Sequence, residues 1–442
     1  MNALLTDLYE LTMAAGYFEA GKASDVATFE LTVRSLPPSR NFVILAGLEQ
    51  GVEYLVNLRF AAEEIDYLRG LEQFARVSPE FFHHLRDLRF TGDLFAVPEG
   101  TPIFAGEPVL TVRAPIIEAQ IVETYLLASI GFQSLVATKA ARIVETAAGR
   151  AVVEFGTRRA QSPAAGVLAG RAAFIGGCVG TSNTLTGFRH GIPVYGTAAH
   201  SWVMSFADEM ESFERLQKLL GPATVYLIDS YDTIEGARKA AALGEPLWGV
   251  RIDSGDLAAL SREVRGILDS AGLPHAKIMA SGDLNEYKIR ELVSAQAPID
   301  AFGVGTELAT SADAPYLGAV YKMVEVGTGP ARRFTAKFSE DKVSLPGSKQ
   351  IFRFADHDQI ACSWESPVPG PERGPVEALL RPTIYGGKLV EPFPDARDAR
   401  ARAAESLRKL PPGCRRLFDP EVYPVEYSRE LLALLDQTRR GQ

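Results

Sequence analysis

Seven short motifs between residues 151 and 306 hold side chains that could do chemistry on an anionic ligand. Each motif follows an apolar or β-branched run. Seven such motifs at a steady spacing are hard to explain by core packing alone. They combine a histidine, several aspartates, arginines and glycine-rich turns, which suit acid–base chemistry and phosphate binding. The motifs are Glu154-Phe155-Gly156-Thr157-Arg158-Arg159, Gly180-Thr181-Ser182-Asn183, Gly196-Thr197-Ala198-Ala199-His200-Ser201, Asp229-Ser230-Tyr231-Asp232, Arg251-Ile252-Asp253-Ser254-Gly255-Asp256, Ser281-Gly282-Asp283 and Gly303-Val304-Gly305-Thr306.

The histidine of the third motif, His200, is one of six in the chain. A neutral imidazole can act as a base or as a nucleophile toward a phosphoryl group. It needs a carboxylate to fix its tautomer, and Asp229 at the next predicted strand end is the natural candidate. The alternative is a histidine that merely caps the following helix.

The aspartates of the fourth to sixth motifs form an acidic group on neighbouring strand ends. Asp253 and Asp256 are separated by a serine and a glycine. This spacing suits Mg²⁺, which takes a few carboxylates and completes its shell with water and substrate phosphate. Carboxylates can also accept hydrogen bonds from ribose hydroxyls. The alternative is helix N-capping, which we expect for one or two aspartates of the group.

Glycines in the last two motifs predict a phosphate cradle. Gly282 and Gly305 would let backbone amides approach an anion, and the N-terminus of the next helix would add its dipole. A tight turn is the alternative for the Gly-Val-Gly-Thr motif.

An aromatic ring and several arginines could hold a flat, acidic ring. Phe155 offers a face for stacking, and Arg158 can pair bidentately with a carboxylate or phosphate. Arg34 and Arg40 flank two prolines in a predicted loop. The alternative for each arginine is a solvated charge or a surface salt bridge.

Strands that alternate with helices, at intervals of about 16–33 residues, must position these motifs. The pattern predicts an irregular TIM-like α/β barrel, whose chemistry collects where strands end. Strands are expected at residues 151–153, 178–180, 193–195, 225–228, 248–251, 278–280 and 301–303, with 321–325 as one more candidate.

The rest of the chain predicts an N-terminal α/β domain over 1–115, the barrel over 116–327 and a C-terminal segment over 328–442. We expect this segment to pack back on the N-terminal domain. Helices are expected at 4–20 with Thr6 as N-cap, at 42–58, 116–127, 134–148, 395–409 and 428–437, and a strand at 26–33.

Composition and charge argue against several classes of binding partner and structural site. The chain has 442 residues, 46% hydrophobic and 23% charged, with a net charge of -9, which argues against nucleic acid and anionic membranes. Three widely spaced cysteines without a CxxC pair argue against a disulfide framework or structural zinc. We find no secretory signal and no apolar run long enough for a membrane span, so we expect a cytoplasmic protein.

Together with Thr6–Thr12 and Val33–Asn41, the motifs resemble nicotinate phosphoribosyltransferase over roughly three quarters of the chain. The resemblance implies an irregular α/β barrel with an N-terminal α/β domain, assembled as a homodimer with the active site at the interface. It implies that nicotinate and 5-phosphoribosyl 1-pyrophosphate give nicotinate mononucleotide and pyrophosphate. ATP hydrolysis would be coupled through a phosphohistidine, with Mg²⁺ as cofactor, in NAD salvage.

The same resemblance implies a role for each site residue. His200 would be phosphorylated and oriented by Asp229, while Arg158 would hold the nicotinate carboxylate. The ring would stack on Phe155, with Tyr9 of the partner subunit on its other face. The remaining implied roles are ring support by Arg251, ribose contacts by Asp253, a 5-phosphate cradle of Gly282, Gly305 and Thr306, and pyrophosphate or ATP contacts by Arg34, Arg40 and Lys322. Asp283, beside the cradle, is also expected to bind substrate, and the spacing of Asp253 and Asp256 predicts the Mg²⁺ site.

Ser182 bears on the choice of substrate. In the related nicotinamide phosphoribosyltransferase the matching residue is an aspartate, which would repel a carboxylate, so Ser182 favours the acid over the amide. The open alternatives are nicotinamide or quinolinate phosphoribosyl transfer, or a non-catalytic barrel that binds a phosphosugar.

Overall fold

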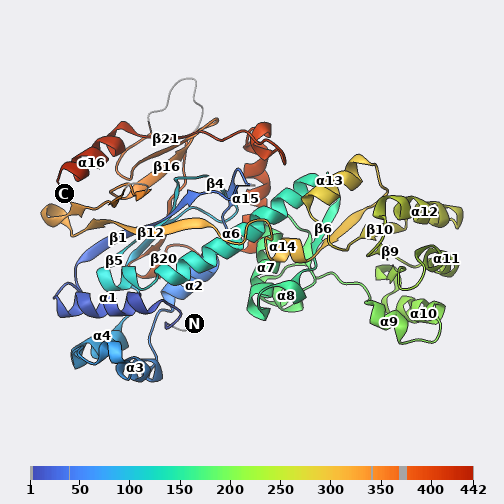
Figure 1. The fold of residues 1–442 in the computed structure, drawn as a ribbon, viewed down its shortest axis with the longest axis horizontal. Coiled ribbons are helices and arrows are strands. Elements are labelled where there is room, and N and C mark those ends of the chain that lie inside the picture. Colours follow the sequence, from blue (N-terminus) through green and yellow to red (C-terminus); the bar gives the residue numbers. More distant parts are fainter. Residues whose placement is uncertain (1–2, 39, 340–341, 368–375, 442) are drawn as a thin grey trace. The chain divides into compact units, whose positions relative to one another are not determined.

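The computed structural model of the chain describes residues 3–38, 40–339, 342–367 and 376–441. The chain divides into two compact units (Figure 1). Unit 1 contains Met1–Leu135 and Tyr316–Gln442, and unit 2 contains Val136–Pro315. These limits differ from the expected boundaries at 115 and 327.

Unit 2 is built on a six-stranded parallel sheet, in the order β7-β6-β11-β10-β9-β8. Its strands are β6 (Ala151–Glu154), β7 (Gly180–Thr181), β8 (Val225–Leu227), β9 (Gly249–Ile252), β10 (Lys277–Ala280) and β11 (Ala301–Val304). Six of the expected barrel strands are therefore present. The expected strand at 193–195 contributes one isolated parallel bridge, from Val194 to Thr181.

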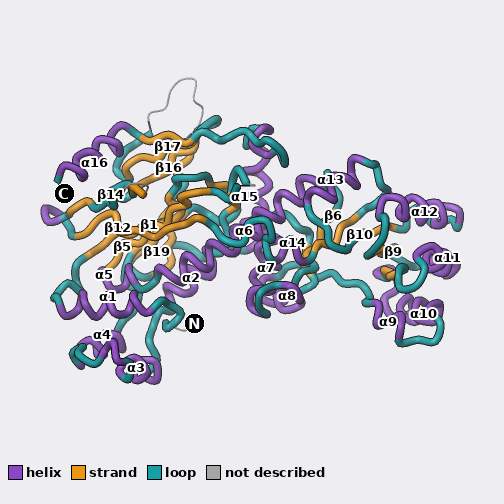
Figure 2. Tube along the Cα trace, in the orientation of Figure 1, coloured by secondary structure: helices purple, strands orange, loops and turns teal. Residues whose placement is uncertain are grey.

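Helices follow the strands of unit 2 and surround them, as Figure 2 shows for α11, α12 and α13 around β9 and β10. The helices are α7 (Pro163–Ile175), α8 (Thr184–His190), α9 (His200–Met204), α10 (Glu209–Leu220), α11 (Thr233–Leu243), α12 (Leu257–Ser270), α13 (Glu286–Ser294) and α14 (Thr306–Ala309). Side chains of Asp232, Asp256 and Asn285 accept backbone N–H groups at the starts of α11, α12 and α13. The N-capping alternative thus holds for Asp232 and Asp256.

Unit 1 is built on a seven-stranded sheet in the order β13-β12-β1-β5-β3-β19-β20. The strands are β1 (Val26–Ser35), β3 (Asp93–Ala96), β5 (Pro108–Pro115), β12 (Gly318–Val326), β13 (Arg333–Phe334), β19 (Arg381–Tyr385) and β20 (Lys388–Leu389). The candidate barrel strand at 321–325 is wrong as such, because it lies in β12, which pairs antiparallel with β1. An apolar alternation shows that a segment is a strand but does not identify its neighbour.

A four-stranded sheet and several helices complete unit 1. The sheet has the order β18-β16-β17-β21, with β16 (Lys349–Arg353), β17 (Asp358–Cys362), β18 (Glu377–Ala378) and β21 (Val425–Tyr427). The short pairs are β2 (Val43–Ile44) with β4 (Pro102–Ile103), and β14 (Phe338–Ser339) with β15 (Lys342–Val343). The helices are α1 (Leu8–Glu19), α2 (Leu48–Val56), α3 (Ala62–Arg69), α4 (Pro79–Asp87), α5 (Ile116–Gln120), α15 (Ala396–Lys409) and α16 (Arg429–Arg440).

Two expectations for unit 1 are wrong in detail. The single helix expected over 42–58 is instead β2 followed by α2, because Gly47 adopts a left-handed conformation and the Glu99 carboxylate accepts the N–H groups of Gly47 and Leu48. Thr6 does not cap α1. Its hydroxyl donates to the carbonyl of Ile121 at 3.2 Å, and Asp7 occupies the N-cap position.

Helix α6 (Glu123–Thr146) follows α5 almost directly. The stretch Ile116–Thr146 is apolar and long enough to cross a membrane by length and composition alone. Most of it is buried inside the protein, as is usual for a core helix.

Candidate active site

The predicted site residues of unit 2 follow successive strands of the parallel sheet. Phe155 follows β6, Ser182 follows β7, Asp229 lies just after β8, Asp253 follows β9 and Gly305 follows β11. Since the strands are parallel, their carboxyl ends meet at one edge of the sheet. The sheet thus gathers side chains that are up to about 150 residues apart in the chain.

His200 and Asp229 are in contact. The Nε2 atom of His200 lies 3.2 Å from Oδ1 of Asp229. The other Asp229 oxygen accepts the backbone N–H of Asp253 at 2.9 Å and the hydroxyl of Ser254 at 2.7 Å. The Asp229 side chain is only 1% exposed, whereas that of His200 is 42% exposed. A fixed carboxylate therefore orients a ring that is open to solvent.

Arg251 connects this pair to the next strand ends. Its guanidinium lies 2.7 Å from Asp253 and donates to the hydroxyls of Ser281 at 2.7 Å and Thr197 at 2.8 Å. Burial by itself would raise the pKa of Asp253, but the Ser281 hydroxyl and the Arg251 charge outweigh it and lower that pKa below its usual value. Asp253 is therefore held as a carboxylate.

Phe155 lies beneath the same arginine. The Arg251 guanidinium carbon is 5.7 Å from the centre of the Phe155 ring. A side chain at Gly303 would overlap the ring, and a side chain at Gly156 would overlap the Gly305 carbonyl, so these glycines permit close packing of two loops. Contacts thus run without a break from Phe155 through Arg251 to the Asp253 and Asp229 carboxylates.

Glu154 braces the loops that follow β6 and β7. It is fully buried and accepts the Thr181 hydroxyl at 2.5 Å and the N–H of Gly156. Burial raises the pKa of Glu154, and the two donors offset that only in part. The backbone N–H of Ser182 donates to the Glu154 carbonyl at 2.8 Å, which places half-buried Ser182 beside this network.

The other predicted ligand-binding residues of unit 2 lie on loops. Arg158 and Thr306 are exposed, and no hydrogen bond or ion pair engages the Arg158 side chain within the described residues. Gly282 has φ +92° and packs against the Asp253 backbone, where a side chain would collide. Asp283 is exposed with φ 46°, and its carbonyl accepts the Lys288 ammonium at 2.8 Å.

Four predicted site residues lie in unit 1. Tyr9 and Arg34 are exposed, on α1 and β1. Arg40 is buried and donates to the Leu135 carbonyl at 2.7 Å. Lys322 on β12 donates to a backbone carbonyl and lies 3.9 Å from Glu123. Their expected roles in phosphate binding and ring stacking stay predictions.

Two carboxylates are available for the predicted magnesium ion. Within the described ranges, no group of three or more His, Cys, Asp and Glu side chains could hold a metal. One Asp253 oxygen is used by Arg251 and Ser281, and one Asp256 oxygen caps α12. The second oxygen of each has no partner in the described chain, which fits Mg²⁺ bound mainly by water and phosphate.

Sequence reasoning missed several residues that hold the site together. Thr197, Ser254 and Ser281 donate or accept at Arg251, Asp229 and Asp253, and Thr181 binds Glu154. Each lies inside one of the seven motifs, next to a residue with an assigned role. The signal that could have identified them is a serine or threonine hydroxyl close to the end of a strand.

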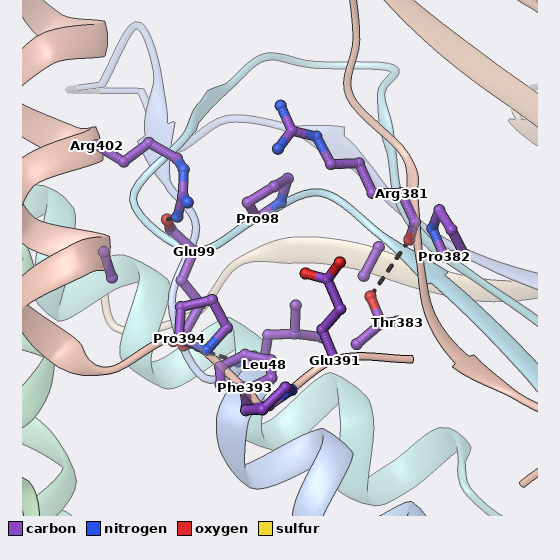
Figure 3. Close-up of a pocket in the computed structure, with 13 residues that line it drawn as sticks. Leu48, Pro98, Glu99, Arg381, Pro382, Thr383, Glu391, Phe393, Pro394 and Arg402 are labelled. Atoms are coloured by element: carbon purple, nitrogen blue, oxygen red, sulfur yellow. Dashed lines mark hydrogen bonds between the residues drawn. The ribbon is translucent and has the colours of Figure 1, made fainter. Parts of the chain in front are cut away.

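A separate cavity of about 160 Å³ lies in unit 1 (Figure 3). Prolines and Phe393 line much of it, and Arg381 and Arg402 contribute two guanidiniums. Its lining includes none of the residues predicted for the site.

Family models and similar proteins together match almost the whole chain. The nicotinate phosphoribosyltransferase (NAPRTase) family model matches residues 151–329, and the N-terminal and C-terminal domain models of that enzyme match 4–131 and 372–435. A nicotinate phosphoribosyltransferase of Mycobacterium tuberculosis is 43% identical over 100% of this chain and 95% of its own length. One from Bacillus subtilis is 37% identical over 97% and 93%.

Solved structures agree with these matches. The crystal structure of human nicotinic acid phosphoribosyltransferase has a TM-score of 0.85 and 31% identity, covering 98% of this chain and 99% of that one. A nicotinate-nucleotide pyrophosphorylase from Pyrococcus furiosus has a TM-score of 0.76 and 28% identity, covering 92% and 95%. The expected fold class, a barrel-type α/β unit with an N-terminal α/β domain, is confirmed.

Proposed function

The chain belongs to the nicotinate phosphoribosyltransferase family, and from that premise we propose how its residues carry out the reaction. The enzyme joins nicotinate to 5-phosphoribosyl 1-pyrophosphate and releases pyrophosphate, a step of NAD synthesis. The contact chain from Phe155 through Arg251, Asp253 and Asp229 to His200 is the observation that supports our residue assignments.

In the transfer step, the pyridine nitrogen of nicotinate attacks C1 of the ribose. The N–C1 bond forms as the bond from C1 to the pyrophosphate oxygen breaks, and that oxygen keeps the electron pair. No general base is needed, because the ring nitrogen already carries a lone pair. The second oxygen of Asp253 accepts hydrogen bonds from the ribose hydroxyls, and its negative charge stabilises the cationic character that develops at C1.

The substrate ring stacks on Phe155, whose position is fixed by Arg251 and by the close approach of Gly303. The Arg158 guanidinium, which has no other partner in the described chain, pairs with the nicotinate carboxylate. Ser182 adds no negative charge near that carboxylate, so the acid is preferred over the amide. Backbone amides at Gly282 and Gly305, with Thr306 and Asp283 beside them, hold the 5-phosphate side of the substrate.

ATP hydrolysis is coupled through His200. With its Nε2–H donated to Asp229, the lone pair of the ring lies on Nδ1. That nitrogen attacks the γ-phosphorus of ATP, the N–P bond forms, and ADP leaves with the electrons of the broken P–O bond. Asp229 stabilises the charged ring, and water later cleaves the N–P bond to give inorganic phosphate. Arg34, Arg40 and Lys322 are our candidates for phosphate contacts.

Asp256 would hold Mg²⁺ through its unused oxygen, and Asp253 through the same oxygen that faces the ribose hydroxyls. When bound, the ion neutralises charge on the leaving pyrophosphate or on ATP. Asp256 also caps α12, so its contribution to metal binding is secondary to that of Asp253.

One assay tests the proposal. The purified chain is incubated with nicotinate, 5-phosphoribosyl 1-pyrophosphate, Mg²⁺ and ATP, and nicotinate mononucleotide and ADP are measured. Nicotinamide replaces nicotinate in a parallel reaction, and we expect much slower turnover. His200→Ala should abolish ATP hydrolysis and its coupling, while slow synthesis without ATP survives. A His200→Ala enzyme with fully coupled ATP hydrolysis would refute the role of His200.

We further propose a homodimer in which exposed apolar surfaces are covered by a second copy. Large exposed apolar patches mark interfaces. One group lies at the start of unit 1, with Leu5, Leu8, Tyr9 and Met13, and another on and after α8, with Leu185, Phe188, Val194 and Tyr195. Phe188 is 87% exposed. Sedimentation equilibrium should give twice the chain mass, and a single-chain mass would rule out the dimer.

ATP and 5-phosphoribosyl 1-pyrophosphate are intracellular metabolites, so we propose a cytoplasmic location. Cell fractionation followed by the assay above checks it, and activity confined to a membrane or secreted fraction would contradict it.

A further inference from the structure

A buried lysine holds three carboxylates in unit 2. Lys139 lies on α6 and its side chain is 1% exposed. Its ammonium is 2.7 Å from Glu286, 2.9 Å from Asp313 and 3.4 Å from Glu307. Arg142, one turn further along α6, contacts the other oxygen of Glu286 at 3.0 Å. A buried ammonium is costly unless it is paired, so these contacts fix its neighbours in place.

The carboxylates sit directly behind the two loops assigned to the 5-phosphate. Glu286 is the first residue of α13, which follows the loop that contains Gly282 and Asp283. Glu307 is the second residue of α14, which follows Gly305. One ammonium therefore joins the starts of both helices and sets the spacing between the two loops.

Charge reinforces this arrangement. Burial alone would lower the pKa of Lys139, but Glu286 and Asp313 outweigh it and raise that pKa, so the ammonium stays charged. Without it, the carboxylates would repel each other and the incoming phosphate.

We propose that Lys139 is a positioning residue for 5-phosphoribosyl 1-pyrophosphate: it aligns the Gly282 and Gly305 loops from behind without touching the substrate. This inference rests on the proposed function, in which these loops bind the 5-phosphate.

The first test is Lys139→Met. We expect the KM for 5-phosphoribosyl 1-pyrophosphate to rise about tenfold or more, because small displacements of binding groups have large kinetic effects. The KM for nicotinate should change less than about twofold, because the Phe155 loop is also held by Arg251 and by the Glu154 carboxylate, neither of which contacts Lys139. Lys139→Arg restores the charge and should recover most of the loss. Equal changes in both KM values, or no change in either, would overturn the proposal.

Lys239→Met is the matched control. Lys239 pairs at 3.0 Å with Glu209, whose side chain is 2% exposed, so this variant also leaves a buried carboxylate without its lysine. It joins α10 to α11 rather than the phosphate loops. Lys239→Met should lower the melting temperature and leave the KM for 5-phosphoribosyl 1-pyrophosphate unchanged. If Lys239→Met raised this KM as much as Lys139→Met does, the effect of Lys139→Met would be one of general stability and not of positioning.

Glu307→Gln keeps the test decisive if Lys139→Met does not fold. Lys139 retains Glu286 and Asp313, so folding is preserved while the tie to α14 is weakened. Removing the negative charge of Glu307 would, by itself, weaken its Coulomb repulsion of the anionic substrate and lower the KM for 5-phosphoribosyl 1-pyrophosphate. We expect the KM to rise about threefold instead, through lost positioning. An unchanged or lower KM would contradict the proposal, whereas a wild-type enzyme that forms no mononucleotide would refute the proposed function itself.

Discussion

The carboxylate of Asp253 in unit 2 is partly exposed to solvent, whereas several glutamates of unit 1 are fully buried. Asp253 is 28% exposed and pairs with Arg251, and its pKa is lowered. Glu10 is fully buried, and burial raises its pKa to about 7 although Gln120 donates to it at 2.6 Å. Glu30 is sealed as well, and burial raises its pKa despite Lys349 at 2.7 Å. A cationic partner therefore does not by itself offset the effect of burial on the pKa of a carboxyl group.

Glu107 and Glu154 follow the same pattern. Glu107 is fully buried in unit 1, and burial and then the neighbouring Asp358 raise its pKa even though Arg353 is nearby. Glu154 belongs to unit 2 but is also sealed, and burial raises its pKa. Among these groups the direction of the pKa shift follows burial rather than the unit: the pKa is raised in the fully buried glutamates and lowered in the partly exposed Asp253.

If the site depends on this open, charged carboxylate, Asp253→Asn should have the largest effect. The amide keeps the shape of the side chain but removes the charge that holds Arg251 and faces the ribose. We expect kcat/KM to fall about 100-fold, measured by nicotinate mononucleotide formation at saturating ATP.

Asp256→Asn is the control for this prediction. Asparagine caps helices about as well as aspartate, so α12 should remain intact and kcat/KM should fall less than about threefold. If Asp256→Asn cost as much as Asp253→Asn, Asp256 would be a principal magnesium ligand rather than mainly a cap.

A smaller effect should come from Glu10, a fully buried carboxyl group of unit 1. In the unfolded chain Glu10 ionises near its ordinary pKa of 4.5, whereas in the folded chain it keeps its proton until about pH 7. Between these values the folded state binds the extra proton, so its free energy of unfolding falls as pH rises, and the loss is complete above about pH 7. Glu10→Gln should remove this part of the pH dependence.

Urea unfolding of wild type and Glu10→Gln between pH 4.5 and 8 checks the sign. The variant should gain stability relative to wild type as pH rises toward 7, and the difference should then level off. Buried acids that do not interact with Glu10 act equally on both proteins and cancel in the difference. If the free energies of unfolding of the two proteins changed in parallel across the whole pH range, the pKa of Glu10 would not be raised in the folded chain.

Much of the site could be predicted because it depends on local order along the chain. Strands that alternate with helices imply parallel strand ends at one edge, and this brings Asp229 to the Asp253 amide and Ser281 to Arg251. Gly47 shows where local reasoning fails: the apolar run 42–58 is consistent with one helix, but Glu99 captures the Gly47 and Leu48 amides and starts the helix later. That partner is distant in sequence and has no local signal.

By itself the sequence determined the α/β alternation, the family and the motifs that end each strand of unit 2, because periodicity and motif spacing are written in neighbouring residues. Only the tertiary structure decided that the segment 321–325 joins β1 in unit 1 and that Lys139 lies behind both phosphate loops. The physical reason is that strand pairing, burial and ion pairing depend on which distant residues meet, and free energies of burial and charge are set by those neighbours.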